Sequence, residues 1–371
     1  MGSVGRRAHR PGWVARYRDP SGRQRSKSFR REVDARRFLT AIEADKLYGR
    51  WIDPKLAEVP FGRYAEEWLQ ITVHEPGTRL NIEGRLRNHI LPFFKDLPLV
   101  AIKSRHVRSW VTELQGKGLA PATVVATYNT FAKIIRTAVI DGLIATTPCL
   151  GIDLPHLGKR EEMRFLDPPA INVLADSLQP RYRALIYTAG YTGMRWGELA
   201  ALRAENLNLL HGFVDVVETQ TEISGNIQIK PYTKSGGRRT ISLPGFLAEM
   251  IGRHMGLYPS AERVFSAAKG GPLRRTFYRR HFLPGVQQAG LAPLRFHDLR
   301  HSCVAMLISE GAHPAEIMQR LGHSSVKTTL DRYGHLFPSL DLRLKDGLQR
   351  LYQESISEAD VQPDPHFRKS S

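Results

Sequence analysis

Cysteine is scarce in this sequence, which has 371 residues but only Cys149 and Cys303. Two cysteines cannot form the disulfide framework of a small secreted domain, so the chain suits a reducing interior. Long apolar runs are also missing, and the opening residues Met-Gly-Ser-Val-Gly-Arg-Arg contain no apolar core of a signal peptide. We therefore expect a cytoplasmic protein that has no membrane partner.

Acidic residues are too few to balance the basic ones. The chain has 54 Lys and Arg against 36 Asp and Glu, a formal net charge of +18. Residues 1–50 hold 14 of the basic and 5 of the acidic side chains, so half of the excess lies in about a seventh of the chain. This distribution favours a DNA or RNA partner, and the alternative is a globular protein that happens to be basic.

The C-terminal third is predicted to contain three short helices in succession. The apolar spacing of residues 298–310 is helical. Pro314 opens the next helix and Gly322 closes it. Ser325 can cap a third helix that runs to Tyr333.

Four polar side chains stand at the ends of these helices. His297 and Arg300 are three residues apart, so they share one face at a helix start. His323 follows a C-terminal glycine, and Tyr333 lies ten residues further on. Such a set can transfer a phosphoryl group: the phenol attacks, while the guanidinium and imidazoles stabilise charge on the non-bridging oxygens. No pair of Asp or Glu accompanies them, so neither a metal nor another cofactor is predicted.

These residues occur in the motifs HxxRH, LGHSS and TxxDRYGH, in that order. A lone HxxR arises by chance, but the succession resembles the catalytic half of the tyrosine recombinase (phage integrase) family. The resemblance implies that Tyr333 is the nucleophile. It also implies that His297, Arg300 and His323 act on the scissile phosphate.

The family resemblance requires one more arginine and a lysine upstream. The sequence GYTGMRWGELAAL resembles the first family motif, in which Arg195 would be a second guanidinium on the phosphate and Glu198 its acidic support. The sequence IQIKPYTKSGGRRTISLP predicts two strands joined by a Gly-Gly turn. Lys234 near this turn matches the family's mobile lysine, the general acid for the leaving 5′ oxygen, and Lys230 is its rival.

Each catalytic residue also has a structural interpretation. Arg195 could form an ordinary helical salt bridge with Glu198. His297 could cap a helix, and Tyr333 could be a core tyrosine. Six positions occurring together in family order favour the catalytic interpretation. The weaker candidates nearby are Arg295, as a rival to Arg300, and His301 and His335, as supporting residues.

The basic N-terminal segment is predicted to be folded. Residues 13–18 and 23–29 have the pattern of strands, and residues 32–47 form an amphipathic helix. A small sheet backed by one helix resembles the arm-type DNA-binding domain of phage integrases and can enter a major groove. The alternative is a basic sheet that binds phosphates without sequence choice. The predicted DNA contacts, with arginines on the open face, are Arg16, Arg18, Arg23, Arg25 and Lys27.

Three domains and a tail are predicted along the chain. The predicted fold is mainly α with small β elements, an α+β class. The weaker candidates for DNA contact in the second and third domains are Arg79, Arg87, Arg274 and Arg275. The domains are an arm-type domain at 1–55, a helical core-binding domain at 56–155, a mixed catalytic domain at 163–345 and a tail at 346–371 whose end is disordered.

The resemblance implies a site-specific recombinase that cleaves and rejoins DNA through a 3′-phosphotyrosyl intermediate and a Holliday junction. Integration and excision of a phage or other mobile element is the expected outcome, with core-type and arm-type attachment sites in double-stranded DNA. Four copies of the chain are expected on the DNA, and a DNA-bending host protein and an excision factor are expected partners. The alternatives are a DNA-relaxing enzyme of the type I topoisomerase kind and a DNA-binding relative without catalysis.

Overall fold

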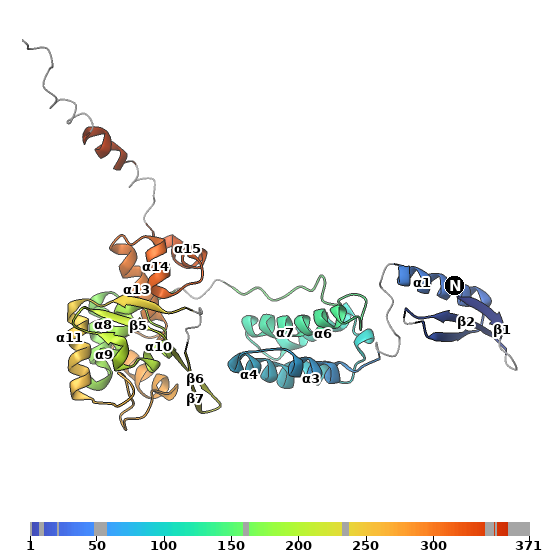
Figure 1. The fold of residues 1–371 in the computed structure, drawn as a ribbon, viewed down its shortest axis with the longest axis horizontal. Helices are drawn as coiled ribbons and strands as arrows, with labels where there is room; N and C mark the ends of the chain where they lie inside the picture. The colour runs from blue at the N-terminus through green and yellow to red at the C-terminus, as the bar shows by residue number, and fades with distance from the viewer. Residues whose placement is uncertain are drawn as a thin grey trace, which may run out of the picture. The chain divides into compact units, whose positions relative to one another are not determined.

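The computed structural model describes residues 2–6, 11–20, 22–47, 58–158, 163–231, 237–337, 345 and 347–354. The chain divides into two compact units, Met1–Arg160 and Glu161–Ser371. Helices predominate and the sheets are small, as the sequence predicts (Figure 1). The first unit contains a sheet-and-helix part and a helical bundle, and each of these has a hydrophobic core of its own.

The sheet-and-helix part is a three-stranded antiparallel sheet backed by one helix. Ala15 and Tyr17 of the middle strand bury their side chains with Ala35 and Leu39 of the helix. The second and third strands and the helix were predicted, whereas no sequence pattern predicts the first strand. The elements are β1 (Ser3–Arg6), β2 (Trp13–Arg18), β3 (Gln24–Phe29) and α1 (Glu32–Leu47), with strand order β1-β2-β3.

The strand register decides which basic side chains the sheet presents on its helix side. Directly paired residues of an antiparallel sheet point to the same face. Arg25 pairs with Tyr17 and Lys27 pairs with Ala15, so both basic residues lie on the face that α1 covers. The Lys27 Nζ lies 4.9 Å from the centroid of the Phe38 ring. The prediction that the arginines lie on the open face is therefore wrong for Arg25, and Lys27, a predicted DNA contact, lies on the helix side as well but is exposed.

The open face of this sheet carries Arg16 and Arg18. They pair with Ser26 and Gln24 of β3, respectively, and all four side chains are exposed. Arg23, in the turn before β3, is exposed as well. Two guanidinium groups therefore stand beside uncharged polar side chains on one surface, as the β-ribbon interpretation requires.

The helical bundle of the first unit has an aromatic core. The rings of Phe61, Phe94, Trp110 and Phe131 pack with centroids 4.4 to 5.9 Å apart. The predicted helix at 76–91 is interrupted by a π-helical turn, because the proline at position 92 has no N–H to continue the helical hydrogen bonds. The elements are α3 (Phe61–Ile71), α4 (Pro76–Arg85), the π turn (Leu86–Ile90), α5 (Leu91–Phe94), α6 (Ser104–Gly116) and α7 (Pro121–Ile140).

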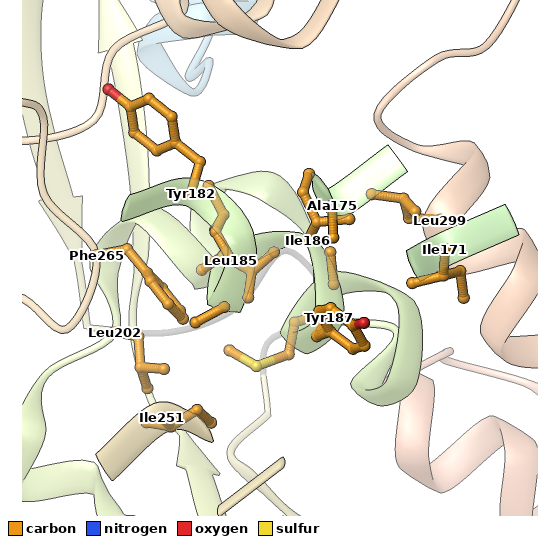
Figure 2. Packing of buried hydrophobic residues seen from close by; sticks show 14 of the residues in the cluster. Ile171, Ala175, Tyr182, Leu185, Ile186, Tyr187, Leu202, Ile251, Phe265 and Leu299 are labelled. Atoms are coloured by element: carbon orange, nitrogen blue, oxygen red, sulfur yellow. The ribbon is translucent and has the colours of Figure 1, made fainter. Parts of the chain in front are cut away.

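The second unit is built around one buried helix, α9 (Pro180–Thr192), in which nine of the 13 residues are buried. The other helices are α8 (Pro168–Asp176), α10 (Trp196–Ala201), α11 (Gly245–Leu257), α12 (Leu283–Gln288), α13 (Asp298–Ser309), α14 (Pro314–Leu321) and α15 (Val326–Tyr333). Helix α9 contacts α8, α10, α11 and α13. Figure 2 shows its side chains, including Leu185 and Ile186, in the core with Phe265 and Leu299. The predicted cap is present, since Asp167 accepts a hydrogen bond from the N–H of Ala170.

The strands described in the second unit belong to two sheets, with orders β4-β5-β8 and β6-β7. The predicted hairpin around the Gly-Gly turn is wrong, because β7 pairs with β6 whereas β8 pairs with β5. The hairpin turn is instead Ser224-Gly225, where φ is +49° and +80°. A two-residue turn of type I′ requires a positive φ at both of these positions. The strands are β4 (Leu207–Asn208), β5 (Phe213–Val216), β6 (Thr219–Ile223), β7 (Asn226–Lys230) and β8 (Arg239–Ser242).

Some predictions fall on residues outside the described ranges. These include Lys234, most of the predicted linker at 50–58, the second half of the predicted linker at 155–162, and most of the tail. The domain boundaries accordingly stay predictions. Across the parts of the chain that the structure describes, none of the helices has the length and apolar character needed to cross a membrane.

Candidate active site

Arg195 stands where two helices meet. Helix α9 ends at Gly193, whose φ of +68° is the left-handed conformation of a helix C-cap. A Cβ on this glycine would lie 2.6 Å from Leu321 Cδ2 and 3.3 Å from Cys303 Sγ, so the close approach also requires glycine. The chain then turns at once into α10, with Arg195 as the N-cap residue.

The C-terminal end of α14 is surrounded by three guanidinium groups. The last carbonyls of a helix have no intrahelical donors and carry partial negative charge, which cations stabilise. Arg300 of α13 is 3% exposed and also donates to the Gly193 carbonyl over 2.5 Å, so it joins the ends of α9 and α14. The bonds to α14 run from Arg239 Nε to Arg320 O (2.8 Å), from Arg300 Nη2 to Leu321 O (2.7 Å) and from Arg195 Nη2 to Gly322 O (3.2 Å).

Glu198 neutralises two of these cations and is only 1% exposed. Its carboxylate accepts hydrogen bonds from Arg195 Nη1 (2.9 Å) and from Arg239 Nη1 (3.1 Å) and Nη2 (2.7 Å). Burial raises the pKa of this carboxyl, but the hydrogen bonds and charge of Arg239, followed by those of Arg195, outweigh burial and leave the pKa lowered. The Arg195–Glu198 pair is therefore part of a buried network and not an ordinary surface salt bridge.

Arg239 belongs to this network although the sequence interpretation passed over it. The signal was the period of two along β8, where Ile241 is 1% exposed. A residue two positions before a buried strand residue lies on the same inward face, and the Arg239 side chain is 8% exposed.

Two imidazoles occupy helix ends beside these arginines. His297 is the N-cap residue of α13, and desolvation followed by the charge of Arg300 lowers its pKa. His323 follows the left-handed C-cap Gly322, and its Nδ1 lies 2.9 Å from Thr329 Oγ1. Burial, then the charges of Arg300 and other arginines, lowers the pKa of His323 to about 4. Both rings are therefore neutral at pH 7.

Tyr333 is the last residue of α15 and is 1% exposed. Its Oη lies 2.6 Å from Nδ1 of His301. Burial raises the pKa of the phenol, while the charges of Arg300 and Arg332 oppose that rise. His301 was expected to be a supporting residue at best, yet the structure puts it in direct contact with the hydroxyl. The spacing of four residues from His297, which gives both rings one helix face, was the available signal.

The predicted site residues thus fall into two groups. Arg195, Glu198, His297, Arg300, His323 and Tyr333 gather where α9, α13, α14 and α15 meet, whereas Lys234 lies outside the described residues. The rival Lys230 ends strand β7. Among the described residues, no group of three or more His, Cys, Asp or Glu could hold a metal ion.

The remaining candidates for DNA contact have local partners. Arg274 Nη1 donates to the Gly225 carbonyl over 2.7 Å, and the N–H of Arg275 donates to Glu222 over 2.8 Å, so this segment holds the β6–β7 hairpin. Of the two candidates in the helical bundle, Arg79 is half-buried and Arg87 is exposed. Arg79 pairs with Glu83 over 2.9 Å, and Arg87 Nε lies 3.4 Å from Asn88 Oδ1.

Comparison with known proteins agrees with this geometry. A model of the phage integrase family matches residues 162–339, and a model of the phage integrase N-terminal SAM-like domain matches residues 61–115. A prophage phiRv2 integrase of Mycobacterium tuberculosis is 30% identical over 351 residues, which cover 91% of this chain and 92% of the relative. The chain belongs to the phage integrase family. The resemblance inferred from the motifs is confirmed.

Solved integrase structures share the fold. The Tn1549 transposon integrase in complex with transposon right end DNA aligns with a TM-score of 0.67 at 18% identity, covering 79% of this chain and 100% of that one. A lambda integrase tetramer bound to a Holliday junction aligns with a TM-score of 0.55 at 20% identity, covering 87% and 95% of the two chains. This integrase-family chain therefore has the predicted fold, mainly helical with small sheets.

Proposed function

We propose that this integrase-family chain is a site-specific recombinase that breaks and rejoins DNA with Tyr333 as the nucleophile. The observation that carries the proposal is the gathering of guanidinium groups, imidazoles and a buried phenol at the ends of α9 and α14. Arginine forks and imidazole donors suit a phosphodiester, whose non-bridging oxygens gain charge in the transition state.

In the proposed reaction, the Tyr333 oxygen attacks the scissile phosphate and the 5′ oxygen leaves. The product is a 3′-phosphotyrosyl bond and a free 5′ hydroxyl, which later attacks the phosphotyrosine of a partner strand. The phosphotyrosyl bond replaces the broken phosphodiester bond and conserves its energy, so rejoining needs neither ATP nor a metal ion. The remaining roles are phosphate binding by Arg195 and Arg300, hydrogen bonding by His297 and His323, support by Glu198 and protonation of the leaving oxygen by Lys234.

Integration and excision of a phage or other mobile element is the reaction that fits the relatives. The Mycobacterium tuberculosis relative is named a prophage integrase, and the lambda integrase structure is a tetramer on a Holliday junction. We infer that four copies of this chain act on two attachment sites in the bacterial nucleoid. A DNA-bending host protein and an excision factor are further proposed partners.

Covalent capture on DNA tests the proposed function directly. The protein is mixed in EDTA with a duplex that it binds and that carries a nick beside the scissile position, and the products are separated under denaturing conditions. The wild-type chain should give a protein–DNA band, because the nick lets the released fragment diffuse away, and Tyr333→Phe should give none. Tyr191→Phe, a change at another tyrosine of the same unit, should leave the band intact.

Two outcomes would contradict the proposed recombinase. The absence of a band from a duplex that the protein binds would remove Tyr333 as the nucleophile and favour a non-catalytic DNA-binding relative. A Tyr333-dependent band together with plasmid relaxation, but without exchange between two sites, would favour the topoisomerase alternative.

The N-terminal sheet is proposed to bind arm-type DNA through its open face. Changing Arg16 and Arg18 together to alanine should make the negative slope of log K against log salt shallower by about 2, because each phosphate contact contributes about −0.9 to it. Arg25→Ala should leave that slope unchanged, because Arg25 faces α1 and donates to Asp19 over 3.1 Å. Fluorescence anisotropy on a labelled duplex between 50 and 200 mM salt measures both, a range over which such slopes are resolved. An equal loss of slope in Arg25→Ala would show that DNA meets the sheet elsewhere.

A further inference from the structure

We infer that His301 accepts the proton of Tyr333 when the phenol attacks DNA and returns that proton on rejoining. The inference rests on the proposed function and adds a catalytic residue to it. His301 Nδ1 lies 2.6 Å from Tyr333 Oη, a hydrogen bond to the atom that would form the new bond. The two side chains are 4% and 1% exposed, so little water can compete for the proton.

Before the attack, both groups are in the protonation states from which this transfer starts. Burial, followed by the influence of His297, lowers the pKa of His301 to about 4, so the ring is neutral at pH 7. A neutral imidazole accepts at one nitrogen only, and the proposed transfer gives this role to Nδ1, the nitrogen that contacts the phenol. Burial raises the pKa of Tyr333, so very little phenolate is present at pH 7 and attack requires an acceptor.

The surroundings can stabilise both products of the transfer. Arg300 and Arg332 favour the phenolate form of Tyr333. Asp298, which is 2% exposed, favours the imidazolium form of His301, whereas burial and the nearby His297, Arg332 and Arg295 oppose that form. The titratable and charged groups that act on His301 are His297, Asp298 and Arg295 from its own segment and Arg332 and Tyr333 from α15.

The other imidazole of the HxxRH motif is placed differently. His297 meets the His301 ring edge to face, with centroids 4.8 Å apart, whereas His301 itself contacts the hydroxyl. His297 is also the N-cap residue of α13 and is exposed, and the proposed function gives it a phosphate-binding role. The geometry therefore separates a phosphate-binding imidazole from a proton-accepting one.

The step balances without any further reactant. The bond from Tyr333 Oη to phosphorus forms, the bond from phosphorus to the 5′ oxygen breaks, and the phenolic proton moves to Nδ1 of His301. Lys234, in the proposed function, supplies the proton that the 5′ oxygen takes. On rejoining, Tyr333 is the leaving group and recovers its proton from the His301 imidazolium.

A substrate with sulfur in place of the bridging 5′ oxygen separates the two proton transfers. Sulfur leaves as a thiolate and needs no acid, so Lys234→Ala should recover cleavage on this substrate. The test variant is His301→Asn in the full chain, because the amide oxygen can still accept a hydrogen bond from Tyr333 but cannot take its proton. Cleavage by His301→Asn should fall by about 10²- to 10⁴-fold on the oxygen and the sulfur substrates alike.

The pH profile on the sulfur substrate gives a readout that a purely structural role would not change. The wild-type rate should be level near neutral pH and should fall in acid as His301 becomes protonated. The rate of His301→Asn should rise with pH, because hydroxide must then remove the phenolic proton. His301→Ala should follow His301→Asn in this profile, and circular dichroism checks that both variants fold.

Four results would overturn the inference or its premise. A His301→Asn rate within about threefold of wild type would mean that a hydrogen bond suffices and no proton is taken. Recovery of His301→Asn on the sulfur substrate would assign the residue to the acid step. A faster rate in either variant would mean that the contact restrains Tyr333. Failure of the wild-type chain to form an adduct on DNA that it binds would instead refute the proposed function.

Discussion

Replacing Arg300 by lysine should lower the rate of covalent-adduct formation by about 10³-fold, although the positive charge is kept. Arg300 donates from two nitrogens to the carbonyls of Gly193 and Leu321, and it thereby holds two helix ends together. A lysine ammonium is a point donor without the planar fork, so it cannot hold both carbonyls and also bind a phosphate oxygen. The rate is measured by quenching the reaction with denaturant at protein concentrations that saturate the DNA.

The matched control is Arg181→Lys in the same unit. Arg181 also uses a guanidinium fork, with bonds to the Ala268 carbonyl (3.1 Å) and to Ser266 Oγ (3.4 Å). Because these acceptors belong to a different segment from the site, the adduct rate should stay within about threefold of wild type. A wild-type rate in Arg300→Lys would show that charge alone matters and that the fork is dispensable.

The helices that carry the site could be predicted from local signals. Pro314 and Gly322 mark the two ends of α14, and the structure has this helix at Pro314–Leu321 with Gly322 in the left-handed conformation. The order of the motifs then identified which polar residues at those ends belong to one site. Local sequence contains this information because helix caps depend on residues only a few positions apart.

Pairing between distant segments could not be predicted in the same way. The Gly-Gly pair suggested a hairpin, but β8 pairs with β5 and the hairpin turn is at Gly225. Strand partners depend on the whole core, and two strands close in sequence can join different sheets. Arg25 and Lys27 are spaced by two from the inward Phe29, so the sequence did indicate that they share its face. The net charge of the segment obscured this signal.

The arginine network around α14 illustrates the same limit. Its donors come from α10, β8 and α13, and their acceptors are carbonyls, which no side-chain motif specifies. The sequence marked Arg195 and Arg300 for their chemistry toward a phosphate. The structure adds that these residues also complete a helix end, so the proposed catalytic groups and the fold depend on the same bonds.

Because the fold depends on these bonds, Glu198→Gln is expected to cause the largest loss of stability among the variants proposed. The neutral amide leaves Arg239, which is 8% exposed, and Arg195 without their shared counter-charge. Removing one partner of a buried ion pair costs about 3–5 kcal/mol, so the melting transition of the second unit should fall by on the order of 10 °C in calorimetry at pH 7. Glu83→Gln breaks a half-exposed pair with Arg79 at the protein surface and should cost less than about 1 kcal/mol.

The pH dependence of this loss separates the charge of Glu198 from its shape. The folded-state pKa of Glu198 lies below its ordinary value of 4.5, so the stabilisation is complete above that value and is lost as pH falls through the folded-state pKa. The difference between wild type and Glu198→Gln should therefore be largest near pH 7 and should shrink in acid, where the wild-type carboxyl is also neutral. A difference that stays constant down to acid pH would mean that the amide disrupts packing and that the charge contributes little. In that case the charge of the buried Glu198 carboxylate would not be what holds Arg195 at the end of α14.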